Sequence, residues 1–69
     1  MNKRTIALAQ RFAMSRLTGD CAWTVAGAFG STLACLELGD DRAAAWHYQQ
    51  GKRYLRAMLK RGQFLPAQH

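Results

Sequence analysis

The stretch from Cys21 to Leu36 constrains the fold more than any other part of the sequence, because it contains no charged residue. It is shorter than the ~20 residues that a membrane-spanning helix needs, and Thr24 and Gly27 interrupt its apolar character. A helix that is apolar around most of its circumference normally lies at the centre of a fold. We therefore expect a central helix here, and we keep a short membrane-active peptide as a third alternative.

Two stripes run side by side along this expected helix. The bulky stripe consists of Val25, Phe29, Leu33 and Leu36. The small stripe has strict four-residue spacing and consists of Ala22, Ala26, Gly30 and Ala34. Residues four apart lie on one helix face, so we expect the small stripe, with Phe29 and Leu33, to pack against another helix or a second copy.

Two glycines lie inside this same helix, at Gly27 and Gly30. Glycine in a helix interior costs about 1 kcal/mol relative to alanine, so something should offset that cost. Close approach of another helix backbone is the simplest compensation. The alternative is a kink or break near 27–30.

Glycine–aspartate pairs divide the chain into three helical segments. Gly19 suits a helix C-cap and Asp20 suits the N-cap of the next helix. Gly39 and Asp40 repeat this stop-and-start signal, and Gly62 follows the last helix. The sequence therefore predicts an all-α fold of three helices, at about 3–18, 20–38 and 41–61, with a helical hairpin.

The two outer helices are predicted to be amphipathic, because their apolar residues recur every three or four positions. The apolar face of the first helix consists of Ile6, Ala9, Phe12, Ala13 and Leu17, with the cations Lys3, Arg4, Arg11 and Arg16 turned toward water. The apolar face of the third helix consists of Ala44, Tyr48, Gly51, Leu55, Met58 and Leu59.

The length of 69 residues allows one small helical domain, 1–69. A chain this short buries only about 60% of its unfolded surface, so small scaffolds often gain stability by associating. We therefore expect a homodimer. Residues 63–69 are expected to fray, with Phe64 and Leu65 folding back on the core.

A polar face of the third helix is the candidate site. At 100° per residue, its basic and amide side chains fall within about 40° of one direction, and Trp46 lies at the edge of that stripe. The predicted partner-binding residues are Arg42, Trp46, Gln49, Arg53, Arg56 and Lys60. Tryptophan and arginine are enriched at binding hot spots, so this face is interpreted as a partner-binding surface. The alternative is a solvated charged face, with Trp46 covering the seam between helices.

The formal net charge of +6 permits nucleic-acid binding, which is the second hypothesis. However, the candidate recognition helix begins with Asp40 and Asp41, and carboxylates at the end that approaches phosphates are unfavourable. A protein with an acidic or apolar docking surface fits this charge distribution better.

Few residues could carry catalysis or bind a metal. His47 is the single candidate general base ahead of the expected tail, and the two cysteines, Cys21 and Cys35, lie ~21 Å apart if the helix holds. That separation argues against a disulfide between them and against a shared metal site. We therefore expect a cytoplasmic protein that is not an enzyme, with no cofactor and no metal.

The residues Ala34, Glu37, Gly39, Ala43, Ala44 and Trp46 form the pattern A-x-x-E-x-G-x-x-x-A-A-x-W. This pattern resembles the centre of the small negative regulators of AraC-type activators, and it is also similar to half a tetratricopeptide hairpin. The first resemblance implies a short helical protein that dimerises and binds a transcription activator. By type alone, the chain also looks like phage- or plasmid-encoded inhibitors of host proteins. The sequence as a whole favours a small inhibitor that binds a host transcription activator.

Overall fold

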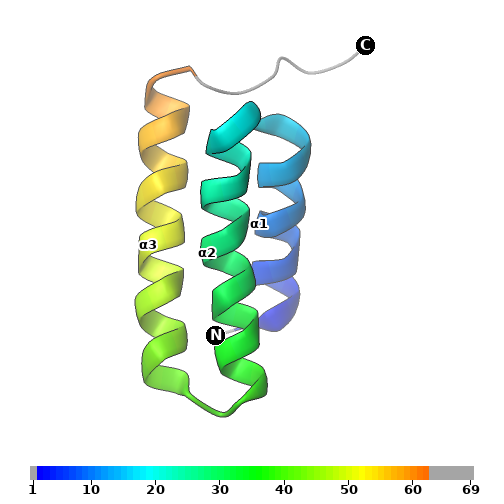
Figure 1. The fold of residues 1–69 in the computed structure, drawn as a ribbon, viewed down its shortest axis with the longest axis vertical. Coiled ribbons are helices and arrows are strands. Elements are labelled where there is room, and N and C mark those ends of the chain that lie inside the picture. The colour runs from blue at the N-terminus through cyan, green and yellow to red at the C-terminus, as the bar shows by residue number, and fades with distance from the viewer. Residues whose placement is uncertain (1, 63–69) are drawn as a thin grey trace.

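The computed structural model describes residues 2–62, and within that range the chain forms three α-helices and no β-strand. The helices are α1 (Lys3–Arg16), α2 (Gly19–Glu37) and α3 (Asp41–Lys60). They run alternately up and down, and α2 lies between the other two (Figure 1). The prediction of an all-α fold with three helices is confirmed. The predicted tail, with Phe64 and Leu65, lies outside the described residues.

The central position of α2 is confirmed, and the helix is continuous from end to end. The expected alternative, a break near 27–30, is therefore wrong. Nothing lies within 4 Å of a Cβ placed at Gly27, which is exposed. No close packing offsets the cost of that glycine, so the continuity of α2 rests on its other side chains. Those buried are Ala22, Val25, Ala26, Phe29 and Thr32.

The turn between α2 and α3 follows the predicted stop-and-start signal. Gly39 has a φ of 78°, and its N–H donates to the carbonyl of Leu36 (3.1 Å). The next N–H, of Asp40, donates to the carbonyl of Cys35 (2.9 Å), which completes a Schellman motif. The Asp40 carboxylate then accepts from the N–H of Ala43 (3.1 Å) as the N-cap of α3. Two residues thus end one helix and begin the next.

The turn between α1 and α2 differs from the prediction. Leu17, rather than Gly19, is the C-cap of α1, and Thr18, rather than Asp20, is the N-cap of α2. Leu17 and Thr18 are both extended, which turns the Leu17 side chain into the core, where it is buried. Gly19 does have a positive φ of 46°, but as the first residue of α2. The need to bury Leu17 therefore overrides the local cap signal.

The start of α1 is capped by Asn2, a residue that the sequence analysis did not use. Its side-chain oxygen accepts from the N–H groups of Arg4 (2.8 Å) and Thr5 (3.4 Å). These bonds satisfy two of the amides that every helix leaves unpaired at its N-terminus. An asparagine directly before a periodic apolar run is the signal that could have located this boundary.

Most of the predicted apolar face of α1 is inside, since Ile6, Ala13 and Leu17 are buried and Ala9 is half-buried. Phe12 is a correction, because its side chain remains 36% exposed. The Arg16 guanidinium lies 5.8 Å from the centre of its ring, and Arg16 is half-buried rather than directed fully to water. A cation over an aromatic face compensates part of the exposure.

The small stripe of α2 packs against α1 within the same chain. Ala22 and Ala26 are buried, and the Gln10 amide nitrogen donates to the carbonyl of Ala26 (3.3 Å). A Cβ at Gly30 would meet that same Gln10 nitrogen at 3.0 Å. The expected approach of a helix backbone to Gly30 is therefore wrong, because a flexible side chain is the nearest neighbour. Ala34, at the end of the stripe, is exposed.

The close approach predicted for α2 occurs instead at Gly51 of α3. A Cβ there would lie 2.8 Å from the Cε1 of Phe29, whose side chain is fully buried. The Phe29 ring also stacks at a tilt on Tyr48, with 6.0 Å between ring centres. The absence of a side chain at Gly51 makes room for the largest buried side chain. Leu33, Leu36, Leu55 and Met58 are half-buried against the core, whereas Leu59 remains 39% exposed.

The buried Thr32 is the single polar residue in the core of the described range. Its hydroxyl donates to the carbonyl of Ala28 (3.0 Å) in the preceding turn, so the buried oxygen has a partner. Among residues 2–62, no helix combines the length and apolar character needed to cross a membrane.

Candidate functional site

The structure places all predicted partner-binding side chains on the solvent side of α3. Each of them is exposed, and together they form one line from the first turn of the helix to its last. We call this set the outer ridge: Arg42, Trp46, Gln49, Arg53, Arg56 and Lys60.

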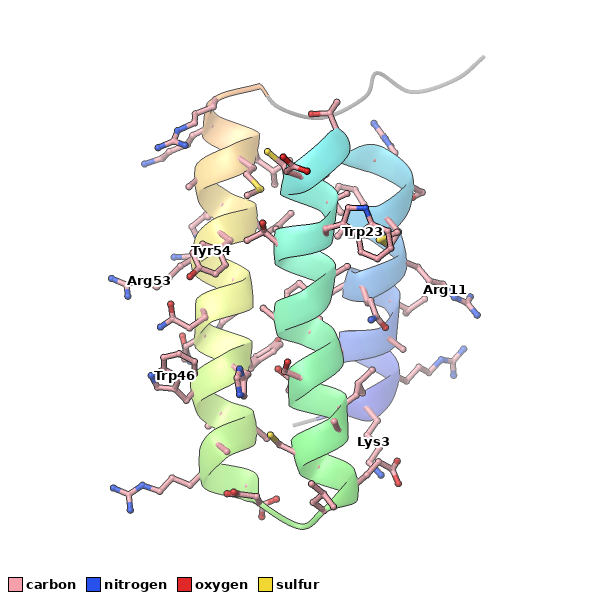
Figure 2. All side chains as sticks on the ribbon, in the orientation of Figure 1. Lys3, Arg11, Trp23, Trp46, Arg53 and Tyr54 are labelled. Atoms are coloured by element: carbon pink, nitrogen blue, oxygen red, sulfur yellow. The ribbon has the colours of Figure 1, made fainter. Side chains whose placement is uncertain are left out.

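The position of the outer ridge follows from the opposite face of the same helix. Ala44 and Gly51 are buried against α2, and they fix the rotation of α3 about its axis. Because each residue turns the helix by 100°, Arg53 then points almost directly away from the core. Figure 2 shows Trp46 and Arg53 both projecting from the side of α3 that faces away from α2. The packing of two small residues thus determines which side chains reach solvent.

Trp46 is 61% exposed, although it is one of the largest apolar side chains in the protein. Its ring meets the ring of His47 edge-on, with 5.0 Å between their centres. Such exposure contradicts the interpretation in which Trp46 covers the seam between helices. An exposed tryptophan beside arginines is typical of residues that lose contact with water when a partner binds.

The C-terminal half of the outer ridge surrounds a shallow depression of about 260 Å³. Arg53, Arg56 and Lys60 form its rim, and the small side chain of Ala57 lies between them. Three cations around one small apolar side chain leave space for an anionic group to approach several of them together. We call this feature the basic depression.

The outer ridge has no counter-charges of its own. Within residues 2–62 one ion pair forms, between the Lys3 ammonium and the Glu37 carboxylate at 3.0 Å, and it joins α1 to the end of α2. Both partners are exposed, so this pair contributes about 0–1 kcal/mol. Asp40 and Asp41 lie at the N-terminus of α3, away from the basic depression, and Asp20 belongs to the first turn of α2. No ion pair joins any of these three carboxylates to the ridge within the described range. The charges of the ridge are therefore available to a partner.

The positive charge of the protein is divided between two sides. Arg11 of α1 and Arg53 of α3 project from opposite edges of the bundle in Figure 2. Arg4 and Arg11 are exposed on α1, with no ion pair in the described range. Arg11 and the outer ridge thus lie on different sides of the bundle.

Other exposed apolar side chains were not singled out from the sequence. Trp23 on α2 is 69% exposed and Met14 on α1 is 45% exposed. A wider depression, of about 610 Å³, is lined by Gln10, Arg11, Met14 and Ser15 of α1. The sequence could have indicated that Trp23 is exposed, because Asp20 and Gly27 lie three and four residues from it on the same helix face. Only α3 combines an exposed tryptophan with a row of cations among the described residues.

The residues considered for chemistry lie on two helices. Cys21 and Cys35 are free and half-buried, and they lie toward opposite ends of α2. His47 contacts Trp46, on a different helix from both cysteines. In residues 2–62 no group of three or more His, Cys, Asp or Glu side chains could hold a metal ion.

Comparison with known proteins adds no relative: the chain matches no protein-family model, no curated protein and no solved structure. The resemblances to negative regulators of AraC-type activators and to a tetratricopeptide hairpin therefore stay predictions. The functional argument depends on the surface chemistry of α3.

Proposed function

We propose that this protein is a small, non-enzymatic regulator of the cytoplasm that binds and inhibits a host protein, a transcription activator, through the outer ridge of α3. The observation that carries the proposal is a row of exposed side chains, four cations and one amide, that runs along α3 past a 61% exposed Trp46. The fold does not need these side chains, because the core uses the other face of α3. Binding would inhibit the partner by covering the surface through which it normally acts.

The energetics of such a surface favour a protein partner. Covering Trp46 removes a large apolar surface from water, and burying such a side chain contributes roughly 1.5–3 kcal/mol. Charged side chains around an apolar anchor add specificity and speed association more than they add affinity. Trp46 is therefore expected to supply most of the affinity and the arginines most of the selectivity.

Homodimerisation is part of the same proposal, but we propose a different surface of α2 for it than the small stripe. The small stripe that suggested it is largely occupied by α1, since Ala22 and Ala26 are buried there. The exposed side of α2, with Trp23, Gly27 and Ala34, is the surface that we propose for self-association. Light scattering of wild-type protein and Trp23→Ala tests this point. A dimer that becomes monomeric in the variant supports it, and a monomeric wild type contradicts it.

Affinity capture tests the main proposal. Tagged wild type, Trp46→Ala/Arg53→Ala and the control Arg4→Ala/Arg11→Ala are compared as baits in lysate of the source cells, with quantitative mass spectrometry. The control removes two exposed cations from α1, one of which, Arg11, projects from the edge of the bundle opposite Arg53 (Figure 2). We expect one host protein to be retained by wild type and control and lost with the α3 variant. Retention by all three baits would contradict the proposal.

Nucleic-acid binding is the second candidate, because the outer ridge is basic and unpaired. Nuclease treatment of the lysate before capture separates the two. A protein partner survives the treatment, whereas complexes held together by nucleic acid disappear. Direct binding to DNA or RNA would also fall steeply as salt rises, since phosphate contacts release counterions.

A further inference from the structure

The two halves of the outer ridge differ in chemistry. Trp46 provides an apolar surface in the N-terminal half, and the basic depression of Arg53, Arg56 and Lys60 lies in the C-terminal half. From the rise of a helix, Trp46 and Arg53 are separated by about 10 Å along the axis, and so are Arg53 and Lys60. A ligand that uses both halves must span about 20 Å.

Fixed charges at the ends of the molecule strengthen this asymmetry. Asp40 and Asp41 lie at the α2–α3 turn, beside the Trp46 end of the ridge, where they offset the charge of Arg42. Glu37, at the same turn, is paired with Lys3. No acidic residue follows Asp41 in the chain, so the C-terminal half of α3 carries cations and no carboxylate. Asp20, in the first turn of α2, is the acidic residue at that end of the bundle among the described residues. Carboxylates on a ligand are thus repelled at one end of α3 and attracted at the other.

We infer that the partner segment is a helix whose own charge is segregated, with acidic residues at one end and an apolar surface at the other. This inference rests on the proposed function and specifies the partner's chemistry. The acidic end lies over the basic depression, and the apolar end packs on Trp46. Recognition of α3 thus depends on the positions of the acidic and apolar ends along the segment, as well as on the segment's total charge.

A helical ligand fits the spacing of the cations. Arg53, Arg56 and Lys60 are separated by three and four residues, which is the spacing of side chains along one helix face. Carboxylates at matching intervals on a helix lying along α3 reach all three cations. Each exposed ion pair is weak, so the cluster acts as a unit and not through one dominant bond.

A polyanion such as single-stranded nucleic acid fits this surface less well. Its charge is uniform, so a strand that follows the whole ridge also passes the carboxylates of Asp40 and Asp41. It also has no apolar block, although its bases could stack on Trp46. Arg11 of α1 projects from the edge of the bundle opposite Arg53, so it does not extend the track (Figure 2).

The test uses the full chain and two fluorescein-labelled helical peptides of identical composition. One carries three glutamates at i, i+3 and i+7 in one half and leucines in the other, and the second mixes the same residues along its length. Fluorescence anisotropy at low salt measures both affinities. We expect the segregated peptide to bind about tenfold more tightly, because three exposed ion pairs together contribute roughly that factor.

A charge swap makes the test independent of folding. Arg53→Glu/Arg56→Glu/Lys60→Glu should lose the segregated peptide and gain a version in which lysines replace its glutamates. An unfolded variant could not gain this selective binding. The control Arg4→Glu/Arg11→Glu changes two exposed cations of α1 and should keep the original preference.

Two results would overturn the inference. One is equal affinity for the segregated and mixed peptides, and the other is tighter binding of a single-stranded oligonucleotide than of either peptide. The capture experiment tests whether a host protein binds through Trp46 and Arg53 at all. If capture fails but the segregated peptide is preferred, the proposed host partner is wrong. If capture succeeds but the two peptides bind equally, the inferred chemistry of the partner segment is wrong.

Discussion

The two faces of α3 have opposite properties. On the inner face, Gly51 lies so close to α2 that a single added carbon would overlap the Phe29 ring. On the outer face, Trp46 and Arg53 are exposed. The inner face is thus determined by packing, whereas packing gives no reason for the residues of the outer face. Side chains that the fold does not require are the better candidates for binding.

The largest expected effect is at the inner contact of α2 and α3. Phe29→Ala should lower the free energy of unfolding by about 3–5 kcal/mol, because it removes the largest buried side chain and leaves a cavity. Guanidinium denaturation followed by circular dichroism measures the change. A loss below about 1 kcal/mol would show that the Phe29 contact does not hold the helices together.

A smaller loss is expected from Gly51→Ala. The new Cβ would lie 2.8 Å from a buried ring that has little room to move, and overpacking of this kind costs about 1–3 kcal/mol. Exposed Gly27 offers a matched control, since Gly27→Ala meets nothing within 4 Å and should gain about 0.5–1 kcal/mol. Equal effects of the two substitutions on the melting temperature would contradict the close approach at Gly51.

The smallest effect is expected at Gly30, on the α1 side of α2. Gly30→Ala gains about 1 kcal/mol of helix propensity but displaces the Gln10 amide, whose hydrogen bond to Ala26 is worth about the same. The free energy of unfolding should therefore change by less than about 0.5 kcal/mol. A loss as large as that of Gly51→Ala would mean that α1 packs as tightly as α3.

The sequence was sufficient to predict those parts of the fold that depend on local signals. Gly39 and Asp40 end one helix and begin the next by backbone and cap hydrogen bonds between near neighbours. The charge-free stretch gave α2 its central position, because an apolar helix has to be covered on most of its surface.

Features that depend on long-range packing could not be predicted. The periodicity placed Gly30 and Gly51 on apolar faces, but the tighter position depends on where the Phe29 ring points in the assembled bundle. Leu17 similarly changed the boundary between α1 and α2, since its burial outweighs the local preference for a cap at Asp20. The exposure of Trp23 was not predicted, because its apolar side chain suggested a buried position.

For the candidate site, the periodicity of α3 was enough to predict which side chains are exposed together. It could not predict the basic depression, because that shape depends on how Arg53, Arg56 and Lys60 are arranged around Ala57. Nor could the periodicity predict whether Trp46 covers the seam between helices or is exposed, because that depends on the positions of all three helices.

A substitution scan along α3 tests the central claim most directly. Each position from 42 to 60 is changed to alanine, or to serine where alanine is native, and every variant is scored for melting temperature and for retention of the captured partner. The account predicts that melting temperature and partner retention fall at two different sets of positions, each with helical spacing. Stability falls at the inner positions Ala44, Tyr48, Gly51, Leu55 and Met58. Partner retention falls at the outer ridge, with Trp46 and Arg53 most affected. Loss of both properties at the same positions would contradict it.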